Sequence, residues 1–195
     1  MAKTHDPRET GPKPPFPPQL QTHPGSVRLM NPPADHGEDN YQGTGKLKAR
    51  VAIITGGDSG IGRAVAIAFA REGADLVLSF LSEEQADADD TAAVIEKSGA
   101  QVVKVAGDIR EIETIDKLIP TADSQFGRLG IVVNNAGYQM SHDDIEELSL
   151  DELDRTFRTN VFATLLLSHA ALKKLPAGGV ISNTTSIQAY DQAPN

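Results

Sequence analysis

From Lys46 onward, short runs of β-branched residues alternate with longer stretches that have the spacing of amphipathic helices. This alternation predicts βαβ units, in which parallel strands form one sheet and the connecting helices cover both of its faces. The predicted strands are residues 51–54, 76–78, 102–105, 131–133 and a fifth that opens at 180–181. We therefore expect an α/β fold with a Rossmann-type, doubly wound parallel sheet.

The helical stretches between these strands carry two irregularities. Pro120 lies inside the stretch from about Glu111 to Phe126. We expect it to kink this helix or to end it early, because proline lacks an N–H and its ring clashes with the preceding turn. The stretch from Leu150 to Leu175 predicts one long helix, or two helices broken near Thr159.

The first 45 residues differ in composition from the rest, since nine of the twelve prolines fall between Pro7 and Pro33. With few large aliphatic side chains, such a segment buries too little apolar surface to offset the entropy of ordering it. We expect residues 1–45 to be an extended or disordered arm and residues 46–195 to be the folded domain. The ordinary interpretation of the arm is a flexible tail, and the alternative is an arm that wraps a neighbouring subunit.

The formal net charge is -9, and the sequence has no Lys/Arg-rich run that would attract nucleic acid or an anionic membrane. It has no cysteine, which excludes disulfides and thiolate zinc sites. Its apolar runs are far shorter than the roughly 20 residues of a membrane helix, and its N-terminus has no secretory-signal core. We expect a cytoplasmic protein with no nucleic-acid or membrane partner and no metal centre.

A glycine-rich turn, Thr55–Gly62, stands between the first predicted strand and a helix. There Gly56 permits a tight turn, Gly60 lets the backbone approach a pyrophosphate, and Gly62 lets helix and strand pack closely. The helix N-terminus offers free N–H groups to phosphates. An ordinary strand-to-helix turn with glycines is the alternative. The predicted cofactor-binding residues in this turn are Gly56, Asp58, Ser59, Gly60, Ile61 and Gly62.

The spacing T-G-x-x-x-G-x-G resembles the glycine pattern of the short-chain dehydrogenase/reductase family, and Asn134–Gly137 matches that family's second signature. Taken alone, this second run would indicate a simple turn. The Pro-rich arm, Gly43–Leu47 and Ser186–Tyr190 are similar to a bacterial subgroup that includes general stress proteins. The resemblance implies an NAD(P)-dependent oxidoreductase that acts on a small-molecule carbonyl/alcohol pair and forms a homodimer or homotetramer.

The resemblance also implies roles for single residues. Asp108 and Ile109 would hold the adenine ring, and the adenosine pocket would be lined by Asn135, Ala136 and Gly137. Asn160 would relay protons through a water, and Ser186 would polarise the substrate carbonyl. Without the resemblance, Asp108 is a helix cap, Asn160 marks a local kink satisfied by side-chain hydrogen bonds, and Ser186 is an ordinary strand-end hydroxyl.

In the family, a Tyr-x-x-x-Lys pair follows the serine by about thirteen positions, and this tyrosine is the general acid/base. Tyr190 comes too early and has no lysine four positions on. The resemblance therefore implies a sheet truncated after the fifth strand and a chain that is inactive alone. The alternative is a non-catalytic fragment or nucleotide-binding module. We also expect the shortened fold to expose apolar side chains of the long helix, namely Val161, Phe162, Leu165, Leu166, Leu167 and Leu172.

Two positions depart from the family pattern. Phe80 ends the second predicted strand, where an NAD-dependent enzyme has an aspartate, so we lean slightly to NADP although Glu83 and Glu84 would repel its phosphate. Gly130 stands where the family has an aspartate before the fourth strand, which puts the stability of that strand in question.

Overall fold

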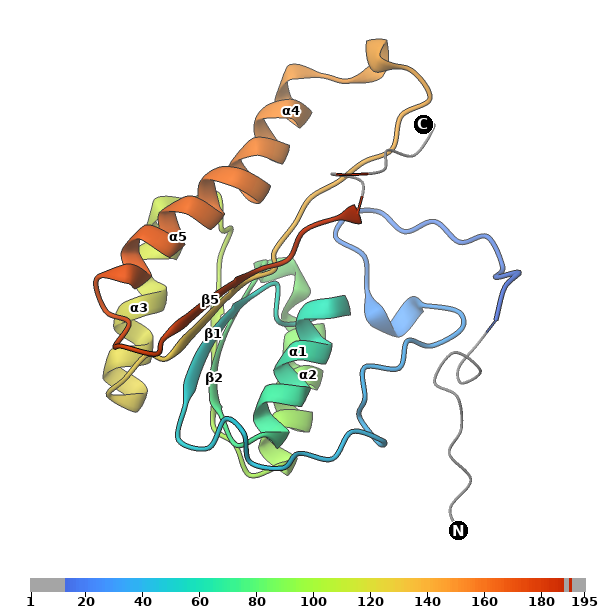
Figure 1. The fold of residues 1–195 in the computed structure, drawn as a ribbon. Helices are drawn as coiled ribbons and strands as arrows, with labels where there is room; N and C mark the ends of the chain where they lie inside the picture. The colour runs from blue at the N-terminus through green and yellow to red at the C-terminus, as the bar shows by residue number, and fades with distance from the viewer. Residues whose placement is uncertain (1–12, 188–189, 191–195) are drawn as a thin grey trace.

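The computed structural model describes residues 13–187 and residue 190, and in this part of the chain parallel strands form one sheet (Figure 1). The strands are β1 (Val51–Thr55), β2 (Asp75–Phe80), β3 (Val102–Ala106), β4 (Ile131–Asn134) and β5 (Val180–Asn183). Their order across the sheet is β3-β2-β1-β4-β5, so the chain winds from β1 first to one edge and then to the other. This topology confirms the predicted doubly wound, Rossmann-type fold.

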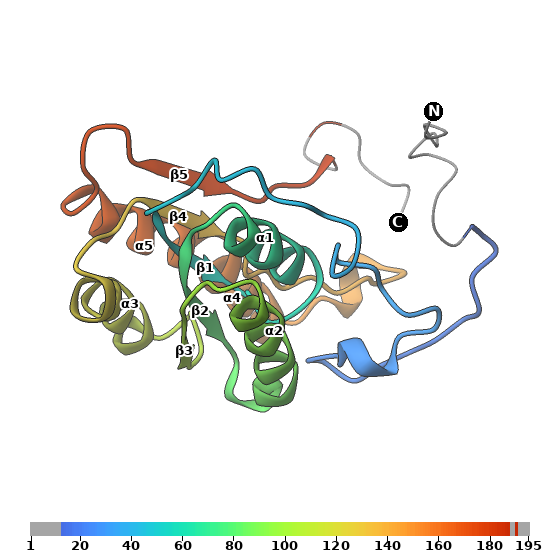
Figure 2. The same ribbon diagram turned by 90° about the horizontal axis from the view of Figure 1, so that it is seen from below.

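Helices cover both faces of this sheet, and Figure 2 shows the two layers from below. One face carries α1 (Gly60–Arg71) and α2 (Gln85–Lys97), and the other carries α3 (Ile112–Phe126) and α5 (Ala163–Leu172). α4 (Leu150–Phe157) continues into α5 through one π-helical turn, η5 (Arg158–Phe162). Short 3-10 turns lie at η2 (Val27–Leu29), η3 (Ser82–Glu84) and η4 (Ile145–Glu147).

The core lies in two layers, one on each side of β1. Ile53 belongs to the layer under α3 and α5, whereas Ile54 belongs to the layer under α1 and α2, because successive side chains of a strand point to opposite faces. All five residues of β1 are buried, as expected for the central strand of a parallel sheet. This buried strand fixes the position of the glycine-rich turn that follows it.

The prediction that Pro120 could end its helix early was wrong. α3 continues past Pro120 to Phe126 and ends at Gly127, which has the left-handed φ of 69° that suits a glycine C-cap. The helix survives because Leu118 and Ala122, on either side of the proline, are fully buried against the sheet. Tertiary packing therefore outweighs the hydrogen bond that proline cannot donate.

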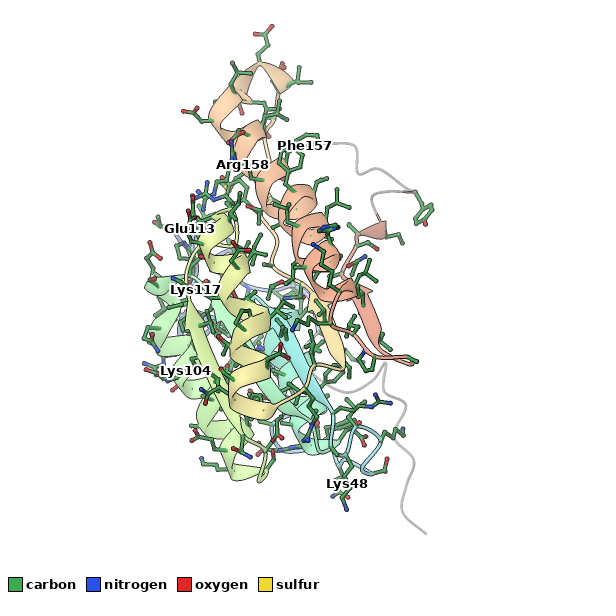
Figure 3. All side chains as sticks on the ribbon, turned by 90° about the vertical axis from the view of Figure 1, so that its left-hand side faces the viewer. Lys48, Lys104, Glu113, Lys117, Phe157 and Arg158 are labelled. Carbon is green, nitrogen blue, oxygen red and sulfur yellow. The ribbon has the colours of Figure 1, made fainter. Side chains whose placement is uncertain are left out.

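Of the two alternatives for residues 150–175, one long helix or two helices broken near Thr159, the structure has one continuous helical segment with a π-helical turn at Arg158–Phe162. The helix also exposes most of the apolar side chains expected of it, and in addition Phe157, which is labelled in Figure 3. The exposed members are Phe157, Val161, Phe162, Leu165, Leu166 and Leu172. Leu167 was wrongly included, because it is fully buried in the core layer beneath α5.

Gly130 does not disturb the fourth strand. Its N–H donates to the Val51 carbonyl oxygen at 3.0 Å, and its own carbonyl oxygen accepts from the Val180 N–H at 3.0 Å. β4 is buried along its whole length. Backbone pairing with both neighbouring strands therefore forms β4 without an aspartate at this position.

Residues 13–45 form mostly irregular backbone that lies against α1 and α2 of the same chain. The Val27 N–H donates to Asp87 of α2 at 2.9 Å, and Arg63 of α1 pairs with Glu38 at 3.0 Å. At the end of α1, the carboxylate of Glu72 accepts hydrogen bonds from the Tyr41 hydroxyl, the Thr44 N–H and the Lys46 N–H. These contacts attach the arm to its own domain at three places. Across residues 13–187, no helix combines the length and apolarity needed to cross a membrane.

Candidate cofactor site

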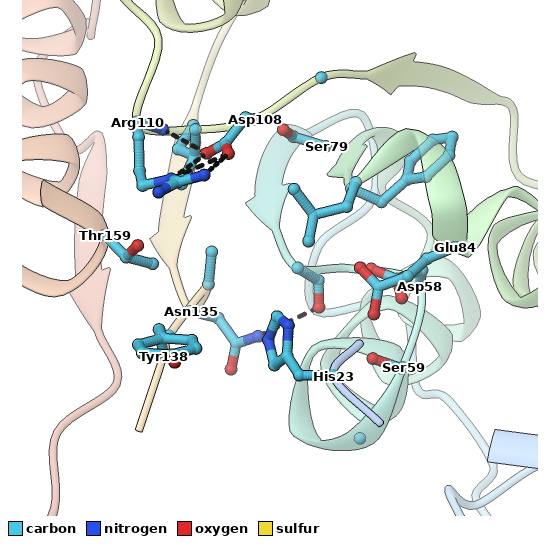
Figure 4. A pocket seen from close by; sticks show the side chains of 18 of the residues that line it. His23, Asp58, Ser59, Ser79, Glu84, Asp108, Arg110, Asn135, Tyr138 and Thr159 are labelled. Carbon is cyan, nitrogen blue, oxygen red and sulfur yellow. Dashed lines mark hydrogen bonds and ion pairs between the residues drawn. The ribbon is translucent and has the colours of Figure 1, made fainter. Parts of the chain in front are cut away.

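A pocket of about 320 Å³ opens at the carboxyl edge of the sheet, where the loops after β1, β2, β3 and β4 meet (Figure 4). In a doubly wound sheet, ligands bind outside the carboxyl ends of the strands, at the point where the strand order reverses, here between β1 and β4. Most of the predicted cofactor-binding residues lie on its wall: Gly56, Asp58, Ser59, Gly60, Ile61, Asp108, Ile109, Asn135, Ala136 and Gly137. Gly62 lies behind the wall, and neither Asn160 nor Ser186 is part of it.

The three glycines of the turn have different geometry. Gly56 has a φ of 60°, and a Cβ there would lie 3.1 Å from the Ala136 Cα. Gly62 faces the backbone of the same turn, and a Cβ there would lie 1.8 Å from the Gly56 carbonyl oxygen. Gly60 has a φ of 49°, and no protein atom lies within 4 Å of where its Cβ would be. The open space beside Gly60, at the first residue of α1, fits a ligand that approaches the helix N-terminus.

The segment after β4 is fastened to this turn through Thr55. The Thr55 Oγ1 accepts hydrogen bonds from the N–H groups of Asn135 and Ala136, both at 3.0 Å. In return, the Asn135 side-chain amide donates to the carbonyl oxygens of Thr55 at 3.2 Å and Gly56 at 3.1 Å. The neighbouring Asn134 amide donates to Asn183 of β5 at 2.8 Å. The second signature thus joins three strands and holds one wall of the pocket in place.

Asp108 does not cap α3, whose N-cap residue is Glu111. Its carboxylate instead accepts from the backbone N–H of Arg110 at 2.9 Å and from the Arg110 guanidinium, with an ion-pair distance of 2.5 Å. Partial burial acts to raise the pKa of Asp108, but the hydrogen bonds from Arg110 outweigh it and lower this pKa. Asp108 is therefore held as an anion on one side of the pocket.

Two further carboxyl groups, Asp58 and Glu84, lie on the other side (Figure 4). Burial, with the charge of Asp58 as the second cause, raises the pKa of Glu84 to about 7. Burial also raises the pKa of Asp58. Phe80, at the end of β2, lines the pocket beside them. Sequence reasoning noted Glu84 only as a charge that would repel phosphate, and had no means of predicting its burial.

Sequence reasoning missed a cluster of His23, Tyr138 and Arg155 on the pocket wall. The His23 ring contacts the Tyr138 ring edge-to-face, with centroids 5.1 Å apart. The guanidinium carbon of Arg155 lies 4.1 Å from the centroid of the Tyr138 ring, and its Nη2 lies 3.0 Å from the His23 Nδ1. Burial and then the charge of Arg155 lower the pKa of His23, which favours the neutral ring. No sequence signal indicates that the arm reaches the pocket.

The two predicted catalytic residues have different surroundings. The Asn160 side chain accepts from the Tyr138 N–H at 2.8 Å and donates to the Tyr138 carbonyl oxygen at 2.8 Å. These two hydrogen bonds join the π-helical turn to the segment after β4. Ser186 is exposed, three residues beyond the end of β5, while Thr184 of the same segment lines the pocket. In the described residues no group of three or more side chains is arranged to hold a metal ion.

Comparison with known proteins shows the family. The short chain dehydrogenase family profile matches residues 50–195. An uncharacterized oxidoreductase of Bacillus subtilis, YhxD, is 42% identical over 179 residues, which are 92% of this chain and 60% of that protein. General stress protein 39 of the same organism is 41% identical over 176 residues, which are 90% of this chain and 61% of that protein.

A short chain dehydrogenase from Burkholderia cenocepacia, solved in complex with NADP, has a similar structure. Its TM-score is 0.71 at 32% identity, and the match covers 75% of this chain and 59% of that one. The chain therefore belongs to the short-chain dehydrogenase/reductase family. It spans about three fifths of the length of these relatives.

Proposed function

We propose that the protein binds a nicotinamide dinucleotide in the pocket at the carboxyl edge of the sheet, as part of an oxidoreductase that interconverts a carbonyl and an alcohol. The observation that carries this proposal is the geometry of Gly60. This residue opens α1 with a left-handed backbone, and the space where a side chain would stand holds no protein atom. A phosphate requires such a space, together with the free N–H groups of a helix N-terminus.

The other walls fit the remaining parts of a dinucleotide. Asp108 and the N–H of Ile109 would hold the adenine ring, and Asn135, Ala136 and Gly137 would line the adenosine end. These assignments come from the family resemblance, and their support is that the residues share one pocket with the glycine turn. When bound, the nicotinamide ring would supply or accept the hydride.

Two residues are proposed for the reaction itself. Ser186 would donate its hydroxyl hydrogen to the substrate oxygen, which polarises the carbonyl. Asn160 would take part in proton transfer through a water, and its hydrogen bonds to Tyr138 would hold the wall of the pocket in position. The general acid/base of the family is a tyrosine in a Tyr-x-x-x-Lys pair, and residues 187–195 contain no such pair. We propose that the 195-residue chain binds cofactor without turning over substrate, a non-catalytic nucleotide-binding module being the alternative.

The proposed partners are a small carbonyl or alcohol substrate and further copies of the protein. Support for self-association comes from the exposed apolar face of α4, η5 and α5, which includes Phe162, Leu165 and Leu166. Soluble monomers seldom expose large apolar patches. We propose that this face is an interface in a homodimer or homotetramer. The cytoplasmic location, and the slight preference for NADP drawn from Phe80, stay predictions from the sequence.

Hydrogen exchange followed by mass spectrometry tests cofactor binding at this pocket. Saturating NADPH or NADH should slow exchange of the backbone N–H groups in residues 56–62 and 135–137, because bound phosphate and adenosine would cover both segments. Residues 112–126, on the far face of the sheet, serve as the internal control and should not change. Equal exchange with and without both cofactors would refute the proposed function.

A further inference from the structure

Asp58 carries a buried carboxyl group that the described residues leave without a hydrogen-bond partner. The residue is 1% exposed, and neither side-chain oxygen has a hydrogen-bond partner among the residues that the structure describes. The Asp58 backbone N–H and the Ser59 hydroxyl favour the charged form of the carboxyl group, but burial outweighs them and raises the pKa of Asp58. Buried polar groups of native proteins are almost always paired, so a ligand is expected to supply the missing donors.

The position of this carboxyl group is fixed from two sides. Thr91 of α2 donates its hydroxyl hydrogen to the Asp58 carbonyl oxygen at 2.7 Å, inside the core. Asp58 also follows Gly57, where a Cβ would lie 2.8 Å from the Leu78 side chain, so the turn packs directly on β2. Asp58 is therefore held on rigid backbone at the wall of the pocket, with its carboxyl group buried beneath the surface.

Glu84 supplies a second carboxyl group on the same wall, from the 3-10 turn η3 that follows β2. Figure 4 shows the two carboxyl groups next to each other. The charged groups that act on Glu84 are Asp58 from the glycine turn, Asp87 from α2 and Glu83 from its own turn, and all of them are acidic. Burial and these charges raise the pKa of Glu84 to about 7.

The basic residues of the pocket do not neutralise this pair. Arg110 is paired with Asp108 on the opposite side (Figure 4), and Arg155 lies over Tyr138 beside His23. Arg63, on α1, pairs with Glu38 of the arm. Within residues 13–187, no group of three or more His, Cys, Asp or Glu side chains is arranged to hold a metal ion.

We propose that Asp58 and Glu84 together select the unmodified adenosine ribose of NAD over the 2′-phosphorylated ribose of NADP, and that a proton on Glu84 weakens this selection. The proposal rests on the proposed cofactor function and deepens it. Carboxylate oxygens only accept hydrogen bonds, so they match the neighbouring hydroxyl groups of a ribose. A phosphate offers acceptors and negative charge, which two carboxylates repel. The selection is opposite to the slight NADP preference drawn from Phe80.

The proton dependence follows from the state of Glu84. Below about pH 7 Glu84 is protonated, its O–H can donate to a phosphate oxygen, and one negative charge is lost. Above about pH 7 Glu84 is an anion, and its charge adds to the repulsion of a phosphate. The 2′-phosphate itself loses its second proton at about pH 6, which also weakens NADPH binding as the pH rises. A variant is therefore needed to separate this effect from that of Glu84.

Binding of NADH and NADPH to the purified protein, measured by nicotinamide fluorescence at several pH values, tests the proposal. At about pH 8 we expect NADH to bind at least about tenfold more tightly than NADPH, with the ratio falling at least about threefold by pH 6. Glu84→Gln should tighten NADPH binding at pH 8 and remove most of the change between pH 7 and pH 8, where the phosphate is already fully ionised. Glu83→Gln removes the same charge from an exposed neighbouring position and is the matched control.

The wild-type protein alone can overturn the proposal, so nothing depends on the variants folding. Equal affinity for the two cofactors, or tighter NADPH binding at pH 8, would refute the selection. A wild-type ratio that does not change with pH, or a Glu83→Gln variant that behaves like Glu84→Gln, would refute the role of the Glu84 proton. If neither cofactor binds at any pH, the proposed function itself fails and this inference fails with it.

Discussion

The carbonyl oxygen of Gly56 occupies the place where a side chain at Gly62 would begin, 1.8 Å from the position of its Cβ. The same Cβ would lie 2.6 Å from the Asn135 side-chain nitrogen. The backbone of α1 therefore contacts the turn after β1 directly, and no side chain fits between them at Gly62. This contact brings the N–H groups of the α1 N-terminus to the pocket.

Gly62→Ala is predicted to reduce stability rather than to block a ligand. The added methyl group meets backbone atoms that cannot move independently, so we expect a loss of about 3 kcal/mol, at the upper end for overpacking. Urea denaturation followed by circular dichroism measures it. Unchanged stability in this variant would show that α1 can shift on the sheet.

Thr55→Val tests the connection between the glycine turn and the segment after β4. The substitution keeps the shape of the buried side chain but removes the oxygen that accepts from Asn135 and Ala136. Two N–H groups lose their partner, so we expect a loss of about 3 kcal/mol in the free energy of unfolding. Thr55→Ser keeps the oxygen and removes only a methyl group, which should cost about 1 kcal/mol. Equal losses in the two variants would contradict this role of the hydroxyl group.

The attachment of the arm at Glu72 predicts a pH dependence. Hydrogen bonds from the Tyr41 hydroxyl and from the N–H groups of Lys46 and Thr44 lower the pKa of Glu72 to about 2. Because the folded-state pKa lies below the ordinary value, the stabilisation is complete above about pH 4.5 and is lost as the pH falls toward 2. We expect the protection factors of the Thr44 and Lys46 N–H groups, which correct for the intrinsic pH dependence of hydrogen exchange, to fall across this range.

Two variants check the assignment of this pH dependence to Glu72. Glu72→Gln should show fast exchange at Thr44 already at neutral pH, with little further change in acid. Tyr41→Phe removes the hydroxyl donor, which is the largest cause of the low pKa of Glu72. The loss of protection at Thr44 and Lys46 should therefore begin at a higher pH than in the wild type. An unchanged profile in Tyr41→Phe would contradict the assignment.

The sequence predicted the sheet and the glycine turn because their signals are local. Residues 51–62 combine a buried strand, a turn that needs glycine and a helix start, and each feature depends on neighbours in the chain. An early end at Pro120, one of the two outcomes predicted, was wrong because the burial of Leu118 and Ala122, which keeps the helix intact, is a tertiary property. The same holds for His23, which reaches the pocket only because the arm is fastened to α1 and α2.

Asp58 shows most clearly which features cannot be predicted from the sequence. Its position in the glycine turn was predicted from the sequence, but its burial and the approach of Glu84 from a different loop were not. A carboxyl group in a turn is ordinarily solvated, and no pattern in the sequence distinguishes it from one that is enclosed. The proposed choice of cofactor therefore depends on a pair of residues that only the folded chain brings together.

The most direct test of the account is calorimetric titration of NADH and NADPH into the wild type, Gly60→Val and Gly99→Val. Both glycines have a left-handed φ, 49° and 88°, and open space at the Cβ position, but only Gly60 lies on the pocket. The two variants should therefore carry similar backbone strain. We predict that the wild type and Gly99→Val bind cofactor and that Gly60→Val does not, because its side chain fills the space for the phosphate. Cofactor binding by Gly60→Val with wild-type affinity would contradict the proposal that the phosphates of the cofactor bind beside Gly60.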